Sequence, residues 1–241
     1  MLSSTLPRPA GISGLTAVLV PAFAGSVLLM APSAAAQQLG TLPSDSHRAA
    51  PPILNFDAHG YGAKSTGPLF TAGPLAPSDL TCTTAPGSVS NNLATATIPG
   101  LATFGAIATN ASGTTDSAGL QTATSQATVG KVSMLGGLVT ADAVTADAKA
   151  TDDAAGTVTA TGNVTLTNLK VAGAAVTAAA PNTTINVLLG TVIVNEQVST
   201  ADGKGIAVNA IHVKLLGNLV DTSVGHAAAA LVPTGTACPA Q

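Results

Sequence analysis

Apolar and polar residues alternate along much of the chain from residue 53 onward, which is the period-two pattern of half-buried β-strands. Three runs show the alternation most clearly, and in each run the two sets of alternate positions are predicted to lie on opposite faces of one strand. The opposed sets are Val192 and Val194 against Thr191, Ile193 and Asn195; Ile206, Val208 and Ala210 against Ala207, Asn209 and Ile211; and Val164, Leu166, Asn168 and Lys170 against Thr165, Thr167, Leu169 and Val171. Several of these strands carry apolar residues on both faces, which favours packing between two sheets.

Residue pairs typical of turns interrupt the alternation roughly every 10–25 residues. They are Pro99-Gly100, Ser112-Gly113, Gly136-Gly137, Asp152-Asp153, Gly162-Asn163, Pro181-Asn182 and Asp202-Gly203. The Ala-rich segment 141–150 has a composition that favours helix, but it also alternates, and because its neighbours are strands we predict a strand there. The sequence therefore predicts an all-β fold of about nine to twelve strands, arranged as an antiparallel β-sandwich or β-roll. Since no fixed repeat length is present, an irregular β-solenoid is the alternative.

Composition narrows the classes of function. Charged residues make up 8% of the 241 residues and the formal net charge is −3, so the chain lacks the basic face of an electrostatic nucleic-acid binder. Aromatic residues make up only 2%, so neither an aromatic carbohydrate-binding platform nor a base-stacking surface is expected. The mean hydropathy of +0.46 also excludes a charged, disordered tail. These values describe a β-rich protein with small side chains and reveal no activity.

The first 36 residues have the organisation of a secretory signal peptide. Arg8 precedes an apolar stretch over 15–30, and three alanines end at Ala36, so cleavage is predicted between Ala36 and Gln37. The apolar stretch is shorter than the roughly 20 residues that span a bilayer, so we predict no transmembrane segment in the mature chain. Residues 37–52 are predicted to be a flexible leader, and residues 53–241 a single all-β domain.

Cys82 and Cys238 are the only cysteines. Export would place them where disulfides persist, and two cysteines permit one intramolecular bridge. We therefore predict a disulfide between Cys82 and Cys238, which would tie the start of the folded part to its end. Free or intermolecular thiols are the alternative.

A resemblance to a known family is carried mainly by the C-terminal half. Segments 181–185 (PNTTI), 190–197 (GTVIVNEQ) and 205–213 (GIAVNAIHV) resemble the choice-of-anchor P family, and segments 56–63 (FDAHGYGA) and 219–227 (LVDTSVGHA) resemble its opening strand and its end. These are exported bacterial proteins that share a core and differ in how they attach to the cell envelope. The resemblance implies an envelope or extracellular protein without an established enzymatic activity.

Few residues offer catalytic or metal-binding chemistry. His59, His212 and His226 fall in separate expected strands and, with Asp57, Glu196 and Asp221, could supply metal ligands, although no local metal motif is present. A strand histidine bonded to a neighbouring group is the competing interpretation. Polar residues interrupt otherwise apolar strands and are expected to satisfy buried backbone groups, with ligand binding as the alternative; they are Asn195, Glu196, Gln197 and Asn209. No hydrolase elbow or phosphate loop occurs, so no catalytic residue and no cofactor are predicted.

The sequence thus predicts a secreted, non-enzymatic protein of the bacterial envelope or extracellular space, with a structural or interaction role and an unknown partner in that compartment. One alternative is a surface- or ice-binding protein, which requires threonines at regular spacing on one exposed face. A second is a metal-binding protein that uses His59, His212 and His226, and a third is a small-ligand carrier with an apolar cavity. The first alternative depends on the pairs Thr95/Thr97, Thr122/Thr124, Thr157/Thr159, Thr159/Thr161 and Thr165/Thr167.

Overall fold

Two antiparallel sheets, one of seven strands and one of nine, build the part of the chain that the structure describes. The structure is a computed structural model, and it describes residues 52–68, 71–153, 155–177, 179–217 and 219–238. These residues belong to one compact unit, residues 48–241. The predicted signal peptide, its cleavage site and residues 37–51 of the predicted leader lie outside the described residues.

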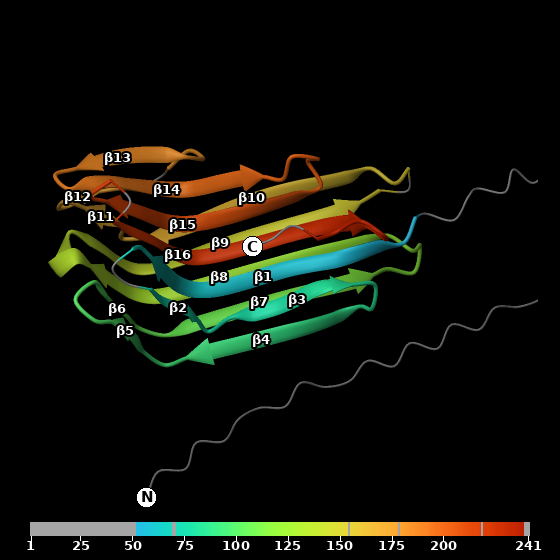
Figure 1. Cartoon of the computed structure of the whole chain (residues 1–241), viewed down its shortest axis with the longest axis horizontal. Helices are drawn as coiled ribbons and strands as arrows, with labels where there is room; N and C mark the ends of the chain where they lie inside the picture. Colours follow the sequence, from blue (N-terminus) through green and yellow to red (C-terminus); the bar gives the residue numbers. More distant parts are fainter. Residues whose placement is uncertain (1–51, 69–70, 154, 178, 218, 239–241) are drawn as a thin grey trace, which may run out of the picture. The chain divides into compact units, whose positions relative to one another are not determined.

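The seven-stranded sheet combines strands from both ends of the described chain (Figure 1). Its order is β13-β14-β15-β16-β1-β2, and β3 also pairs with β1. The strands are β1 (Leu54–Thr66), β2 (Ala72–Leu75), β3 (Ser78–Thr83), β13 (Thr183–Val187), β14 (Gly190–Ser199), β15 (Gly205–Leu215) and β16 (Val220–Pro233).

The nine-stranded sheet is formed by the contiguous middle of the chain. Its order is β12-β11-β9-β8-β6-β5, with β10 paired to β9, β7 paired to β8, and β4 paired to β7. A short 3-10 helix, η1 (Leu135–Gly137), connects β8 to β9. The strands are β4 (Gly87–Leu93), β5 (Ala96–Ile98), β6 (Ala102–Phe104), β7 (Ile107–Thr115), β8 (Gln121–Met134), β9 (Val139–Asp152), β10 (Val158–Thr167), β11 (Lys170–Val171) and β12 (Ala174–Ala175).

The two sheets pack face to face, since β1 and β16 contact β8, and β15 contacts β9 and β10. The fold is therefore an antiparallel β-sandwich, as predicted, and not the irregular β-solenoid. The described residues form more strands than the nine to twelve expected. The surplus consists of short strands, such as β11 and β12 with 2 residues each, which are too brief for an alternating pattern. The Ala-rich segment 141–150 lies inside β9, so its prediction as a strand is confirmed.

Small side chains fill the space between the sheets. Many inward positions are alanines with no exposed surface, among them Ala123, Ala127 and Ala146. Two glycines allow the layers to approach further: a Cβ on Gly113 would lie 2.5 Å from the Phe56 ring, and a Cβ on Gly162 would lie 2.6 Å from Val208 Cγ2. The predictions of turns at Ser112-Gly113 and Gly162-Asn163 are therefore wrong. These glycines lie inside β7 and β10, where the opposite sheet leaves no room for a side chain.

The alternation of side chains reverses along one line across the seven-stranded sheet. In each of four adjacent strands, two consecutive residues are buried along this line. Asn195 (φ 55°) and Gly225 (φ 63°) adopt left-handed backbone there, which turns the next side chain to the other face. The buried pairs are Val194 and Asn195 in β14, Ala210 and Ile211 in β15, Val224 and Gly225 in β16, and Gly62 and Ala63 in β1.

This reversal corrects two sequence predictions, and a break in the nine-stranded sheet corrects a third. Asn195 and Ile211 were expected opposite the buried positions of their strands, but their exposed fractions are 8% and 0%. The run from Val164 to Val171 was expected to be one strand, but Asn168 has φ 52° and separates β10 from β11. As a result, Leu169 and Val171 are buried. At Asn195 and Asn168 the backbone itself is left-handed, whereas Ile211 changes face beside the left-handed Asn195 and Gly225 of the adjacent strands; the apolar pattern alone shows none of this.

Candidate functional site

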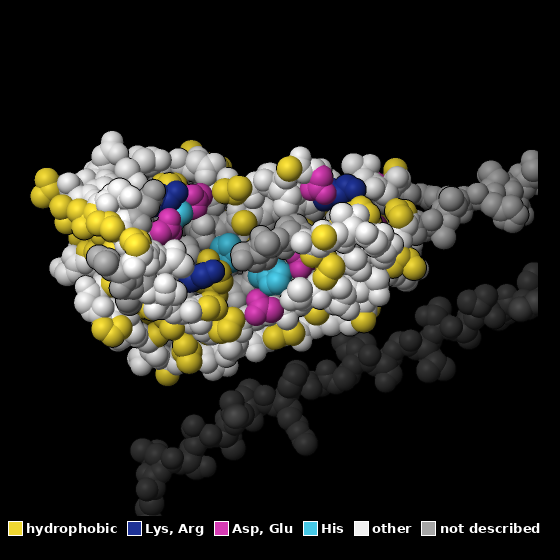
Figure 2. Space-filling model, in the orientation of Figure 1, with side chains coloured by type: hydrophobic (Ala, Val, Ile, Leu, Met, Phe, Trp, Pro, Cys, Tyr) yellow, Lys and Arg dark blue, Asp and Glu magenta, His cyan; other side chains and the backbone are white. Residues whose placement is uncertain are grey.

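The outer surface of the seven-stranded sheet at the line of reversal carries two polar rows, which we call the crease. The first row is Glu196, Asn209, His226 and Tyr61, paired across β14, β15, β16 and β1. The second row is His212, Ser223 and Lys64, paired across β15, β16 and β1, and the apolar Ile193 continues it on β14. Two inward residues separate the rows along each strand, so polar side chains three positions apart share one face. Figure 2 shows histidine, acidic and lysine side chains gathered on this face.

His212 is held between two carboxylates in the crease. Its Nδ1 donates to Glu196 Oε2 at 2.7 Å, and its Nε2 donates to Asp221 Oδ1 at 2.7 Å. Burial lowers the pKa of His212, but the hydrogen bonds to Glu196 and Asp221 outweigh it, and the pKa lies above its usual 6.5. The hydrogen bond from His212 likewise lowers the pKa of Glu196. Because each ring nitrogen faces a carboxylate oxygen, which accepts hydrogen bonds, both nitrogens carry a proton and His212 is an imidazolium between two carboxylates.

His226 is in the opposite protonation state to His212. Burial in the sheet, reinforced by the nearby positive charges of His59 and Lys64, lowers the pKa of His226 to about 4. Its ring stacks on Tyr61 with centroids 4.3 Å apart and planes inclined by 12°. Its Nδ1 lies 2.8 Å from Asn209 Oδ1. At neutral pH this histidine is uncharged.

A pocket of about 230 Å³ opens between the two rows. Tyr61 contributes its hydroxyl, which lies 2.9 Å from Ser223 Oγ, and burial raises the pKa of Tyr61 so that the phenol stays neutral. The ammonium of Lys64 lies 5.9 Å from the centre of the Tyr61 ring. The pocket is lined by Tyr61, Lys64, Thr66, Asn209, His212, Asp221, Ser223 and His226.

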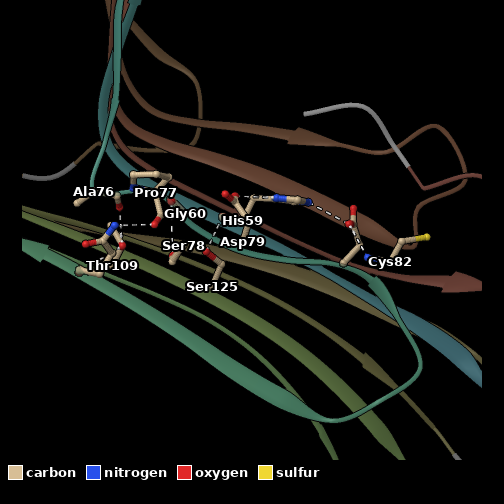
Figure 3. A network of polar contacts seen from close by, with 11 residues as sticks. His59, Gly60, Ala76, Pro77, Ser78, Asp79, Cys82, Thr109 and Ser125 are labelled. Carbon is tan, nitrogen blue, oxygen red and sulfur yellow. Dashed lines mark hydrogen bonds and ion pairs between the residues drawn. The ribbon is translucent and has the colours of Figure 1, made fainter.

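His59 belongs to a separate cluster beside β3 (Figure 3). Its Nε2 lies 2.9 Å from Asp57 Oδ1, and its Nδ1 lies 3.0 Å from Asp79 Oδ1. Burial lowers the pKa of His59, but these two hydrogen bonds outweigh it, and the pKa lies above 6.5. The backbone N–H of Cys82 also donates to Asp57 Oδ1, at 3.4 Å. Ser125 of the other sheet donates to the His59 carbonyl at 2.6 Å, so this cluster also joins the two layers.

The structure does not bring the three candidate metal ligands together in one set of contacts. His212 and His226 share the crease, where Asn209 and Glu196 connect them, whereas His59 bonds to Asp57 and Asp79. Among the described residues no group of three or more His, Cys, Asp or Glu side chains is placed to hold a metal ion. Among the acidic residues considered as metal ligands, Asp57 bonds to His59, whereas Glu196 and Asp221 both bond to His212.

The four polar residues singled out in β14 and β15 divide into two roles. Asn195 Nδ2 donates to the carbonyl of Ala179, and Gln197 Nε2 donates to the carbonyl of Gly162, so these two satisfy backbone groups as expected. Glu196 and Asn209 instead join the histidines of the crease. Tyr61, Lys64 and Ser223 were missed by sequence reasoning, because only the reversal of alternation places them beside Asn209 and His212.

The predicted disulfide is present between Cys82 and Cys238. It joins β3 to the segment after β16, and the Cα atoms are 5.9 Å apart across a sequence separation of 156. Because β3 also holds Asp79, the bridge fixes the strand that supports the His59 cluster. No helix in the described part of the chain is both long and apolar enough to cross a membrane.

Hydroxyl side chains occupy much of the outer surface of the nine-stranded sheet, which we call the hydroxyl face, although Lys149 and the row Gln126, Asp147 and Asn163 interrupt them. Thr165, Thr145 and Thr128 are paired across β10, β9 and β8, and the last two hydroxyls lie 3.1 Å apart. The Thr122/Thr124, Thr159/Thr161 and Thr165/Thr167 pairs lie on this sheet's outer side, whereas Thr95/Thr97 lies at β5. The face comprises Ser112, Thr114, Thr122, Thr124, Thr128, Thr145, Thr151, Thr159, Thr161, Thr165 and Thr167.

No family model, curated protein or solved structure matches this chain. The fold class, an antiparallel β-sandwich closed by one disulfide, rests on the structure. The resemblance to the choice-of-anchor P family stays a prediction.

Proposed function

We propose that this protein is a secreted, non-enzymatic protein of the bacterial cell envelope or extracellular space, with a structural or interaction role. The observation that carries the proposal is the bond between Cys82 and Cys238. Disulfides persist in oxidising compartments and are rare in the cytosol of most organisms. The signal-peptide pattern ending at Ala36 and the family resemblance point to the same compartment.

The state of the ionisable groups favours a role without catalysis. A general base needs a pKa near the working pH and a free position from which to take a proton. His59 and His212 each have both ring nitrogens bonded to carboxylates. Such mutually satisfied pairs shift pKa values for structural reasons, and these two histidines hold strands together.

Recovery of the protein from the bacterium that produces it tests this proposal. Cells and medium are fractionated, and the N-terminus and the thiol reactivity are determined by mass spectrometry. We expect a chain that begins at Gln37 in the medium or envelope fraction, with Cys82 and Cys238 protected from alkylation until a reductant is added. A cytoplasmic chain that retains Met1 and reacts at both cysteines would overturn the proposal.

The hydroxyl face favours a second candidate, binding to an ordered surface such as ice. Threonines occupy four of the five outward positions of β10, and Asn163 occupies the other. Thr159 and Thr165 are in register with threonines of β9 and β8, whereas Thr161 pairs with Lys149 and Thr167 with Ala143. The resulting grid has spacings of about 4.8 Å across strands and about 6.7 Å along them. Thr159, Thr161, Thr165 and Thr167 are all exposed.

Thermal hysteresis of the purified domain tests the second candidate. The wild type should lower the freezing point without lowering the melting point, and Thr161→Tyr or Thr165→Tyr should abolish the effect by breaking the flat grid. Thr184→Tyr is the matched control, because Thr184 is exposed on β13 of the other sheet. Absence of hysteresis in the wild type, or equal loss with the control, would exclude ice binding.

A further inference from the structure

One ring nitrogen of His226, which lines the pocket of the crease, has no hydrogen-bond partner among the described residues. Glu196 Oε2 can only accept hydrogen bonds, so the group of Asn209 that lies 2.7 Å from it is the donating Nδ2. Asn209 Oδ1 therefore faces His226 Nδ1, which must carry the proton of the neutral ring. Nε2 is left with a lone pair. Among the described residues no side chain or backbone group donates a hydrogen bond to it, although only 9% of His226 is exposed.

The other groups that line the pocket define which kind of ligand could donate a hydrogen bond to Nε2 of His226. Lys64 can only donate, Asp221 can only accept, and the hydroxyls of Ser223 and Thr66 do both. The formal charges at the crease balance, since the cations Lys64 and His212 face the anions Glu196 and Asp221. A ligand that donates to His226 and Asp221, and accepts from Lys64, therefore needs hydroxyl groups and no net charge.

Size and charge exclude other classes of ligand. The volume of about 230 Å³ lies below the 300–1,000 Å³ typical of drug-sized ligand pockets, so the occupant is about one small ring. A phosphate would be repelled by Asp221 beside it. A metal ion would find one free nitrogen, because Glu196 and Asp221 already hold His212.

We propose that the crease binds a neutral polyhydroxylated molecule, a single sugar residue or a polyol, with one of its hydroxyl groups donating to Nε2 of His226. The ligand seats beside the stacked rings of Tyr61 and His226, and Lys64 and Ser223 hold its remaining oxygens. This site is independent of the secretion proposal and of the hydroxyl face. It would give the protein a specificity for the end of a glycan or for a small free polyol.

Nitrogen-15 NMR of the histidine side chains in the oxidised domain tests the proposal. D-Glucose, D-galactose, N-acetylglucosamine and glycerol are titrated separately to about 100 mM, well above a dissociation constant of about 1 mM. We expect at least one probe to shift the Nε2 resonance of His226 saturably, while the resonances of His59 stay in place. Glycerol alone would indicate a free polyol, and a sugar alone would indicate a glycan residue.

Two variants assign the shift to the pocket. Lys64→Met removes a charged donor and should weaken the saturable binding about tenfold or more, whereas Lys170→Met on β11 of the other sheet should leave it unchanged. Equal weakening by both variants would show that the shift does not arise in the crease. If none of the four probes moves Nε2, the proposal is wrong. If zinc chloride moves it and the sugars do not, a metal ligand replaces the sugar.

Discussion

The neutral state of His226 makes the stability of this protein sensitive to acid in a definite window. The folded pKa is about 4, whereas an unfolded histidine has a pKa of about 6.5. Below pH 6.5 the unfolded chain therefore binds a proton at this histidine that the folded chain does not bind, and acid favours unfolding. The stability that the neutral ring contributes is complete above pH 6.5 and is lost as pH falls to about 4.

The size of this loss follows from the two pKa values. Integrating the difference in bound protons gives a loss of about 2 kcal/mol between pH 7.5 and pH 5, and about 3 kcal/mol by pH 4. The variant His226→Gln keeps an N–H that can donate to Asn209 Oδ1 but does not titrate. The free energy of unfolding of the variant should therefore not include this acid-dependent loss. As pH falls from 7.5 to 5, the free energy of unfolding of the wild type should fall by about 2 kcal/mol relative to that of the variant.

Urea unfolding followed by far-ultraviolet circular dichroism measures the effect at several pH values, with equal m-values as the check that both proteins unfold alike. His59→Gln is the control of opposite sign. The pKa of His59 is raised, so its contribution is complete below pH 6.5 and is lost as pH rises through the folded pKa. If the wild type and His226→Gln respond identically from pH 7.5 to pH 5, His226 is not a buried neutral ring and the reasoning fails.

Three further predictions concern the disulfide, the packing of Gly113 and the hydrogen bonds of His212. Cys82→Ser should lower the stability of oxidised protein by up to about 5 kcal/mol, given a loop of 156 residues, and reductant should erase the difference. Gly113→Ala should cost about 1–3 kcal/mol in urea unfolding by pressing on Phe56, whereas Gly87→Ala on the paired strand should be nearly neutral. The stability advantage of wild type over His212→Gln should decline as pH rises above 6.5, and an advantage constant to pH 9 would contradict the imidazolium state of His212.

The sequence predicts the strands well because small inward residues leave alternation as the dominant pattern. Val192, Val194 and Val208 are fully buried, on the face of their strands that the alternation predicts. The disulfide is also predictable, since two cysteines allow one pairing. The glycines account for the wrong predictions of turns. Gly113 and Gly162 are of the residue type that is common in turns, but they lie within strands because the opposing sheet leaves no room for a side chain there.

The crease could not be predicted, because its cause is conformational. Ala210 and Ile211 are both apolar, so their sequence does not show that both face inward. Once the phase changes there, Asn209 and His212 share a face, although alternation places them on opposite sides. The partners of His212 come from neighbouring strands, Glu196 in β14 and Asp221 in β16, and no local spacing indicates them.

The pairing of β1 with β16 determines the order in which the molecule can assemble. The strands of the nine-stranded sheet, β4 to β12, follow one another along the chain, so this layer can form while later residues are still emerging. The other layer cannot, because Leu54 near its beginning pairs with Pro233 near its end. Contacts of such long sequence separation form slowly, since a large loop must close first. The protein therefore completes its second layer and its disulfide only after β16 and Cys238 have been synthesised.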